Sequence, residues 1–355
     1  MTLTDTPPTT EPEWLATGKK GAPAVLRWVV AILGALAAFS VIIVFKGANP
    51  AEVFGDMWVS TFVRPRSLVE ILNTMAPIAL AGLAVVVPAR AGMSNVGGEG
   101  QLLVGGISAA GIALATDQFL PGEVVLVLMV LAGMVGGAAW AAIAGVLRLV
   151  FQVNEAVSTL LLNFVAMDLL LFLIYQPWRE DPSGQPTSRE LADVAKMPEI
   201  SGLGIGIGIV IAVAAAIAVF FVLRYTRWGF KLSVVGGNAE AARRAGLNVP
   251  MLILSALLVG GALAGIAGMI QFAGIEYKLR AGFGLQIGYI GFLASWLARH
   301  QPLPVLVASF VFAALAVAGD SLQLDAQLPA ATVSILTAFI LIAVLGFTQK
   351  KGATL

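Results

Sequence analysis

Residues 76–106 read APIALAGLAVVVPARAGMSNVGGEGQLLVGG, in which a glycine-rich polar break separates two apolar runs. Each run belongs to a stretch of about 20 residues, the length that a helix needs to cross a bilayer. Irregular backbone at membrane depth persists only where protein or a water-filled cavity covers it. The break at 88–101 therefore leaves two interpretations open: a broken helix whose polar groups face an aqueous pathway, or a cytoplasmic turn in which Asn95 or Glu99 caps the next helix. The polar side chains concerned are those of Ser94, Asn95, Glu99 and Gln101.

The composition of the whole chain indicates an integral membrane protein. Of its 355 residues, 59% are hydrophobic and only 12% are charged, and the mean hydropathy is +0.92. A soluble domain carries about 25% charged residues. The net charge of +1 gives no large basic field and argues against a nucleic-acid partner. The absence of cysteine excludes disulfides and thiol catalysis, and the single histidine, His300, argues against a histidine-based metal centre.

Ten apolar stretches are candidate membrane spans, so the expected fold is an all-α polytopic membrane protein of about ten transmembrane helices, some of them short or broken. The candidates are residues 25–45, 69–88, 99–116, 121–147, 155–175, 203–223, 251–274, 285–298, 303–319 and 329–347. The first 24 residues are rich in Thr, Pro and Glu and predict a disordered cytoplasmic tail. The domain assignment is thus a tail at 1–24, a transmembrane domain at 25–347 and a second cytoplasmic tail at 348–355.

The distribution of charge predicts the orientation of the spans. If the N-terminus lies inside, the cytoplasmic segments hold most of the 21 lysines and arginines, and the opposite loops hold most of the carboxylates. This bias follows the positive-inside rule and places both termini in the cytoplasm. The longest loop on the outer side, 176–202, is rich in proline and charge. Structureless loops of that length are usually functional or mobile.

A polar segment at 224–250 contains a short predicted helix with both ends marked. Asn238 is a good N-cap, Glu240 falls in the first turn where the helix dipole favours an anion, and Gly246 supplies a left-handed stop. A capped, charged helix on a cytoplasmic loop predicts a docking surface for a soluble partner, and a plain amphipathic connector is the alternative. The docking residues would be Asn238, Glu240, Ala241, Ala242, Arg243, Arg244 and Gly246.

The fifth span, 155–175, carries a stripe of polar residues. At 100° per residue, one helical face holds Glu155, Ser158, Thr159 and Asn163. Asp168 points to nearly the opposite side. Because polar residues in a span usually face the bundle interior or a pore, the stripe is interpreted either as pathway lining or as a set of interhelical hydrogen bonds. Asp168 is interpreted as a structural partner to another helix.

Two stripes of small residues predict close helix packing, because small side chains let helix backbones approach where lipid supplies no hydrophobic drive. They are Gly133, Gly137, Ala141 and Gly145 in the fourth span, and Gly260, Ala264 and Gly268, beside Gly261 and Gly265, in the seventh.

The two halves of the chain contain short segments of similar sequence. LAGLA at 80–84 recurs as LAGIA at 263–267, and GEGQ at 98–101 is echoed by GFGLQ at 282–286, which predicts an inverted repeat.

The sequence lacks the common catalytic motifs, so we expect that the chain is not an enzyme. It has no G-x-x-x-x-G-K-S/T and therefore cannot cradle ATP phosphates in the manner of a P-loop; H-E-x-x-H and G-x-S-x-G are absent as well. The glycine-rich run at 202–206 lacks the strand and the third spaced glycine of a dinucleotide site. We expect no cofactor or metal to be bound by this chain.

Four stretches resemble the permeases of ABC importers for nucleosides and simple sugars, relatives of the ribose and branched-chain amino-acid permeases. They are 76–106, quoted above, NEAVSTLLLNFVA (154–166), GFKLSVVGGNAEAARRAGLNV (229–249) and GGALAGIAGM (260–269). The resemblance extends over residues 68–347. In such families two permease subunits pair as a homo- or heterodimer, cytoplasmic ABC ATPase subunits drive alternating access, and an external binding protein delivers the solute.

The resemblance implies a permease subunit of the plasma (inner) membrane that translocates a small polar solute, nucleoside first and simple sugar second. ATP would be hydrolysed by the partner subunits. The spacing E-A-A, three residues, then G, from Glu240 to Gly246, is similar to the loop that these permeases press into a cleft of the ATPase. An ion-coupled secondary transporter using Glu155 or Asp168 as its relay is the alternative from another class, and a structural or assembly membrane protein is a third. The docking loop distinguishes them, because a secondary carrier would not need it.

Overall fold

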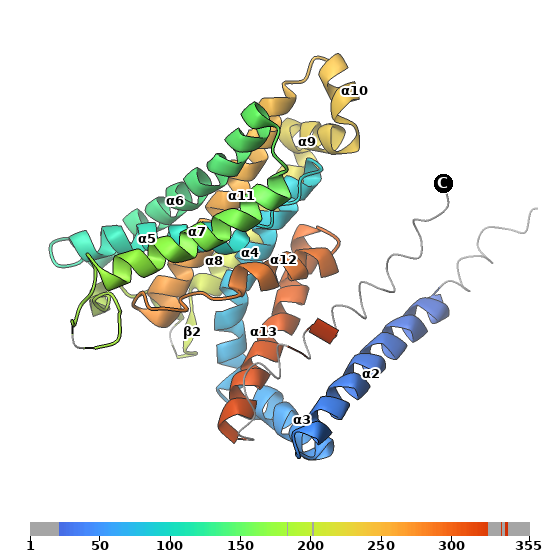
Figure 1. The fold of residues 1–355 in the computed structure, drawn as a ribbon, viewed down its shortest axis with the longest axis vertical. Coiled ribbons are helices and arrows are strands. Elements are labelled where there is room, and N and C mark those ends of the chain that lie inside the picture. Colours follow the sequence, from blue (N-terminus) through green and yellow to red (C-terminus); the bar gives the residue numbers. More distant parts are fainter. Residues whose placement is uncertain (1–20, 183, 201, 326–334, 336–337, 340–355) are drawn as a thin grey trace, which may run out of the picture. The chain divides into compact units, whose positions relative to one another are not determined.

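The computed structural model describes residues 21–182, 184–200, 202–325, 335 and 338–339, and its regular structure is almost entirely helical (Figure 1). This confirms the expected all-α membrane fold. In chain order the elements are α2 (Gly21–Phe45), α3 (Pro50–Trp58), η1 (Val59–Val63), α4 (Ser67–Arg90), α5 (Gly98–Thr116), α6 (Gly122–Phe151), α7 (Glu155–Tyr175), η2 (Asp193–Ala195), β1 (Glu199–Ile200), β2 (Ile205–Gly206), α8 (Gly208–Tyr225), α9 (Arg227–Gly237), α10 (Ala239–Arg244), α11 (Val249–Gln271), η3 (Phe272–Glu276), α12 (Ile287–Leu297) and α13 (Pro302–Asp325).

Among the described residues, seven helices are long and apolar enough to cross a membrane, and they match seven of the ten expected spans. They are α4, α5, α6, α7, α8, α11 continued by η3, and the Pro302–Gly319 part of α13. The helices Leu33–Phe45 and Pro50–Val63, bent by 116°, add an eighth if they form one broken span.

The remaining expected spans are not matched in this way. The span expected at 285–298 contains only α12, whose 11 residues are short for a crossing. The span expected at 329–347 and the tails at 1–24 and 348–355 lie outside the described residues, apart from 335, 338–339 and the start of α2 at Gly21. The count of ten spans and the inverted repeat therefore stay predictions.

The chain divides into two compact units, one formed by Met1–Met57 with Gly319–Leu355 and the other by Trp58–Ala318. In the first unit, the rings of Phe39 and Phe54 join α2 to α3 at a centroid distance of 6.0 Å, and Phe39 is fully buried. The residues that the sequence analysis marks as functional all belong to the second unit.

The second unit is built around α4 and α11, which pack against each other. In the most apolar window of α4, 83% is buried, and α11 also packs on α5 and α6. The same windows of α6, α7 and α8 are only 28%, 33% and 28% buried, so these three helices lie at the periphery of the unit. A peripheral apolar helix faces either lipid or a further protein surface.

The two stripes of small residues meet where α6 crosses α11. A Cβ atom added to Gly265 would overlap the carbonyl oxygen of Gly133, and one added to Gly137 would overlap the carbonyl oxygen of Gly261. The helix backbones are therefore in direct contact, an approach that only glycine permits. The prediction that the stripes are packing surfaces is confirmed.

The break between α4 and α5 turns back into the unit. The side-chain amide of Asn95 donates to the carbonyl oxygen of Ala84 at 3.1 Å, although α4 continues to Arg90. At 1.5 Å per residue, the break thus returns about 9 Å along α4 before α5 begins. This geometry agrees with the broken-helix interpretation, because the irregular backbone is enclosed by neighbouring helices.

Candidate functional site

The predicted docking helix is α10, which stands with α9 at one end of the second unit (Figure 1). The side chain of Asn238 accepts a hydrogen bond of 2.9 Å from the backbone N–H of Ala241, which confirms the N-cap. Glu240 lies in the first turn, and Arg243 and Arg244 lie in the last, as predicted. Gly246 has φ +82°, so the left-handed stop is confirmed as well.

The two faces of α10 differ. Ala242 is fully buried on the inner face of the helix, whereas Ala241 is exposed on the outer face. The carboxylate of Glu240 accepts from Arg243 at 2.8 Å and from Arg244 at 3.2 Å, contacts that the sequence analysis did not anticipate. All three side chains are at least 56% exposed, so these ion pairs contribute little stability. They do hold the three charged side chains together beside the exposed Ala241.

A second group of predicted residues meets in a buried polar cluster at the break between α4 and α5. Asn95 and Gln101 pair through their side-chain amides, each donating to the other at 3.0 Å. Asn95 also accepts from the backbone N–H of Gly97 at 3.1 Å. Both side chains are almost completely buried. The pair fixes the irregular backbone through hydrogen bonds to Ala84 and Gly97.

The polar stripe of α7 faces this break, and its members bond to the backbone there. Asn163 accepts from the N–H of Gly100 at 2.8 Å and donates to the carbonyl oxygen of Val96 at 3.0 Å. Thr159 accepts from the N–H of Val96 at 3.2 Å. All four stripe residues, Glu155, Ser158, Thr159 and Asn163, are buried. The stripe thus supplies the interhelical hydrogen bonds that were one of its two interpretations.

Glu155 closes the cluster at the end where α7 begins. One of its carboxylate oxygens accepts from the backbone N–H of Ser94 at 3.3 Å, and the other is paired with Arg148 of α6. Ser158 donates to the carbonyl oxygen of Glu155 at 3.2 Å. Ser94 is the one predicted residue of the cluster whose side chain is exposed.

Glu99 connects the break to a distant part of the chain. Its carboxylate accepts from the backbone N–H groups of Gln286, at 2.6 Å, and Gly288, at 2.7 Å. The carboxylate therefore accepts hydrogen bonds from the N-terminus of α12, where the helix dipole favours an anion. Neither Asn95 nor Glu99 caps α5, whose N-cap, Gly97, makes no side-chain capping hydrogen bond. The capping role considered for the cytoplasmic-turn interpretation is thus wrong for α5.

Two residues of the cluster were not predicted from the sequence. The hydroxyl oxygen of Tyr289 accepts a hydrogen bond of 3.2 Å from the side-chain amide of Asn163, and Arg148 pairs with Glu155. A signal was present for the first, since GFGLQ at 282–286 was noted as an echo of GEGQ at 98–101. The structure brings these two segments together through Glu99. Whether the cluster lines a solute pathway stays a prediction.

Asp168 has no hydrogen-bond or ion-pair partner among the described residues. Its side chain is exposed on the outer face of α7, so the expectation of a structural partner on another helix stays a prediction. The 100° periodicity placed Asp168 correctly opposite the stripe. The stripe face is buried against α5, which leaves Asp168 pointing out of the unit.

The loop at 176–202, expected to be functional or mobile, is fastened to the unit at several points. The buried carboxylate of Asp117 accepts from Arg189 at 2.8 Å and from the N–H of Ala192 at 3.2 Å. Ser188 exchanges hydrogen bonds with Leu279, and β1 pairs antiparallel with β2, Glu199 opposite Gly206. These contacts give the loop a defined conformation over much of its length.

An exposed ion-pair group lies on the same loop. The Lys196 ammonium contacts Asp193 at 2.8 Å and Glu190 at 2.9 Å, and it lies 4.7 Å from the centre of the Tyr277 ring. The hydrogen bond from Lys196 lowers the pKa of Asp193. Hydrogen bonds to Asp193 and then Glu190 raise the pKa of Lys196 above its usual value. Both groups are therefore charged at neutral pH.

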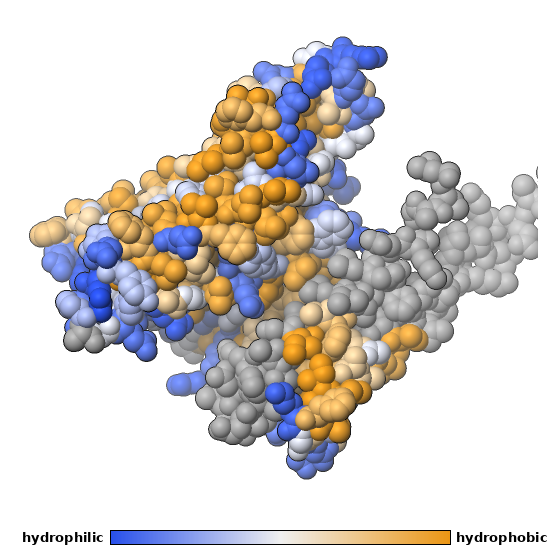
Figure 2. Space-filling model, viewed as in Figure 1, coloured by the Kyte–Doolittle hydropathy of each residue, from blue (hydrophilic) through white to orange (hydrophobic). Residues whose placement is uncertain are grey.

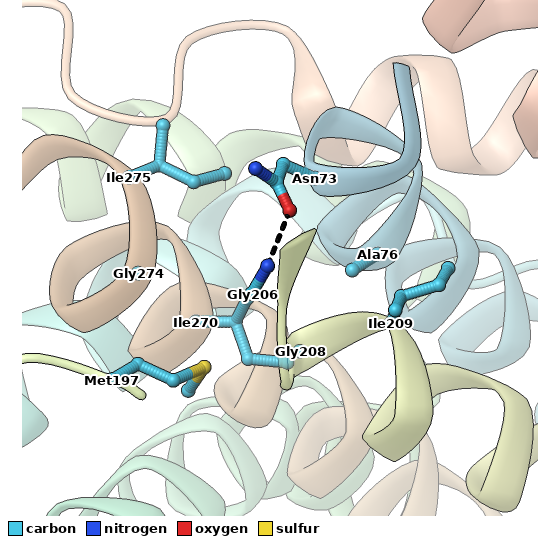
Figure 3. Close-up of a pocket in the computed structure, with 9 residues that line it drawn as sticks. All are labelled: Asn73, Ala76, Met197, Gly206, Gly208, Ile209, Ile270, Gly274 and Ile275. Atoms are coloured by element: carbon cyan, nitrogen blue, oxygen red, sulfur yellow. Dashed lines mark hydrogen bonds between the residues drawn. The ribbon is translucent and has the colours of Figure 1, made fainter. Parts of the chain in front are cut away.

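A cavity under this loop is too small for a solute. The side chain of Asn73 accepts from the N–H of Gly206 at 2.8 Å at its edge (Figure 3). The volume of about 10 Å³ corresponds to one water molecule. The lining residues are Asn73, Ala76, Met197, Gly206, Gly208, Ile209, Ile270, Gly274 and Ile275.

Comparison with known proteins identifies relatives over nearly the whole chain. Residues 67–345 match the family described as the permease component of branched-chain amino acid transport systems. The glucose ABC transporter permease protein TsgB13 of Haloferax volcanii is 36% identical over 347 residues, covering 95% of this chain and 89% of that protein. The guanosine ABC transporter permease protein NupP of Bacillus subtilis is 28% identical over 338 residues, covering 92% and 97%. The probable riboflavin import permease protein RfuC of Treponema pallidum is 26% identical over 321 residues, covering 89% and 84%.

Proposed function

Because this chain belongs to the family of branched-chain amino acid transport system permease components, we propose that it is one of two permease subunits of an ABC importer for a neutral, hydroxyl-bearing solute. It is a multi-pass membrane protein of the ABC permease type. Its proposed activity is to translocate a solute and not to catalyse a reaction. ATP is hydrolysed by separate subunits, and an external binding protein delivers the solute. The end of the second unit that carries α10 lies in the cytoplasm, together with both termini.

The single observation that supports this proposal best is the geometry of α10. A six-residue helix, capped by Asn238 and ended by Gly246, presents the small side chain of an exposed Ala241 beside ion-paired charged side chains. A convex element of that kind fits into a concave partner surface, since small side chains permit close seating. The fully buried Ala242 anchors the helix to its own subunit, so movement of the partner is transmitted to α9 and α11, on which α10 packs.

The solute class rests on the names of the relatives and on the chemistry of the chain. Glucose and guanosine, named for two relatives, are both neutral rings with several hydroxyl groups. The chain offers no metal-binding group of three or more His, Cys, Asp or Glu residues among those the structure describes. A nucleoside is our first choice and a simple sugar our second. The permease subunits need not select the solute by themselves, because the external binding protein binds it first.

The test is reconstitution of the chain with an ABC ATPase, a second permease and a binding protein that co-purify with it. Uptake of labelled guanosine or glucose into vesicles should require ATP on the side that carries α10. Transport that follows an imposed ion gradient and ignores ATP would establish the secondary-transporter alternative instead. Leucine uptake in the absence of guanosine and glucose uptake would refute the proposed solute class.

A further inference from the structure

The outer face of α7 combines one carboxylate with aromatic rings. Asp168 is exposed, and residues at helical spacing on either side of it share its face: Phe164, four positions before, is 62% exposed, and Phe172, four positions after, is 59% exposed. Tyr175 follows on the same face at 50%. Helix α7 runs along the near side of the second unit, where the surface is largely hydrophobic with isolated hydrophilic atoms (Figures 1 and 2).

Asp168 lies at membrane depth. Helix α7 spans Glu155–Tyr175, so Asp168 is thirteen residues from one end and seven from the other. At 1.5 Å per residue these are distances of about 20 Å and about 10 Å. A hydrocarbon core about 30 Å thick covers a helix of this length almost completely. The carboxylate therefore lies inside the bilayer and not at the headgroups.

Among the described residues, no cation is paired with Asp168. In the described residues no hydrogen bond or ion pair joins Asp168 to another group, in contrast to Glu99 and Glu155 in the neighbouring spans. No lysine, arginine or histidine occurs at 28–45 or 326–349, the apolar stretches of the other unit. An ionised side chain facing lipid is costly, and such residues almost always face the protein interior or a water-filled cavity. The face that holds Asp168 therefore meets water in the assembled transporter.

We propose that the outer face of α7, centred on Asp168, lines the solute pathway of the assembled importer, and that its carboxylate accepts hydrogen bonds from hydroxyl groups of the passing solute. This inference rests on the proposed function, because the opposite wall of the pathway is the second permease subunit. Aromatic rings stack on the flat faces of sugars or nucleobases, while a carboxylate binds the hydroxyl groups at their edges. The ligand class is a neutral ring that bears hydroxyl groups. The buried stripe on the other side of α7 then supports the pathway wall from behind.

The absence of cysteine allows a clean accessibility test. Asp168→Cys is made in the full chain, assembled with its partner subunits in vesicles, and treated with a charged, membrane-impermeant maleimide. The thiol reacts only as a thiolate in contact with water. Val135→Cys on α6 is the matched control, since it is thirteen residues from the start of a span, 68% exposed and apolar. We expect rapid labelling at 168, slowed by guanosine or glucose, and none at 135.

Uptake measurements test the hydrogen-bonding role. Asp168→Leu removes the acceptor, and we expect uptake to fall about tenfold because hydrogen bonds to charged groups are strong. Asp168→Asn keeps one acceptor oxygen but loses the charge, so its uptake should lie between those of Asp168→Leu and the wild type. No labelling at 168, equal labelling at 135, or normal uptake by Asp168→Leu overturns the inference. In each case wild-type uptake driven by ATP shows that the proposed function still holds, whereas its absence from the wild type would refute the proposed function itself.

Discussion

The carboxylate of Glu99, in the first turn of α5, accepts a 2.7 Å hydrogen bond from the buried backbone N–H of Gly288, in the first turn of α12. Two helices that begin inside the unit are thereby joined at their N-termini. The backbones touch as well, because a Cβ atom on Gly288 would overlap the backbone of Glu99. The positive ends of two helix dipoles face one carboxylate, an arrangement that would be unfavourable without the negative charge. Any relative motion of α5 and α12 must break this contact.

Replacement of Glu99 should destabilise the second unit. Glu99→Ala leaves the N–H groups of Gln286 and Gly288 without their acceptor, and we expect the free energy of unfolding to fall by about 2–4 kcal/mol. Glu99→Gln keeps one acceptor oxygen and should fall between the alanine variant and the wild type. Thermal unfolding of the detergent-solubilised chain measures the order. Glu123→Ala, which removes an exposed carboxylate from the first turn of α6, is the control and should shift stability by less than about 1 kcal/mol.

Asn163 and Tyr289 should be energetically coupled. The Asn163 amide donates to both the Val96 carbonyl and the Tyr289 hydroxyl, so it holds the break and α12 together. Asn163→Ala should cost about 2–3 kcal/mol, and Tyr289→Phe about 1 kcal/mol. In the double variant the tyrosine change should cost much less, giving a coupling energy of at least about 0.5 kcal/mol. Strict additivity would show that the two side chains act independently.

Asp117 should control the order of the loop at 176–202. Its buried carboxylate pairs with Arg189, so Asp117→Ala leaves the guanidinium without its partner and frees the N–H of Ala192. Removing one member of a buried ion pair costs about 3–5 kcal/mol, and partial exposure of Arg189 puts the expected loss at or below the lower limit. Limited trypsin digestion of sealed vesicles should cut the variant after Arg179 or Arg189 faster than the wild type. Unchanged cleavage would show that the Ser188–Leu279 contacts suffice.

Local features of this fold were predictable from sequence because their causes are local. The caps of α10 depend on Asn238 and Gly246, a few residues apart, and the structure confirms both. The apolar runs also set the span bounds closely. The span expected from 203 begins later, at Gly208, because Ile205 and Gly206 pair in a strand instead.

Long-range contacts were not predictable, because the residues around a position do not identify which distant residue it will contact in the fold. The partners of Glu99 lie 187 and 189 residues away. The helical periodicity of α7 separates the face of Asn163 from the face of Asp168 but does not say which is buried. Packing against α5 determines which face is buried. The face of Asn163 packs against α5 and forms part of the buried polar cluster, and the face of Asp168 is exposed.

The left-handed conformation of Gly246 should be essential for coupling. A Cβ atom there would meet nothing within 4 Å, so any penalty arises from the backbone φ of +82° and not from crowding. A β-branched residue resists positive φ, whereas asparagine adopts it several times more often than most residues. Gly246→Val should therefore misdirect the chain after α10 and abolish uptake while membrane insertion is kept. Gly246→Asn should retain both uptake and the ATPase subunits on purification.

The exposed face of α10 can be tested without disturbing its fold. Ala241 is exposed, so Ala241→Arg should leave the helix intact, since arginine is a good helix former. If α10 seats in a cleft of the ATPase, a side chain of this size must prevent close contact, and the purified complex should lose both ATPase subunits and solute-stimulated hydrolysis. Ala281→Arg adds the same charge at an exposed alanine outside α10 and should retain the ATPase. Normal uptake by both Ala241→Arg and Gly246→Val would identify the 238–246 segment as a connector, because a docking surface could not tolerate both an added bulky cation and a misdirected backbone.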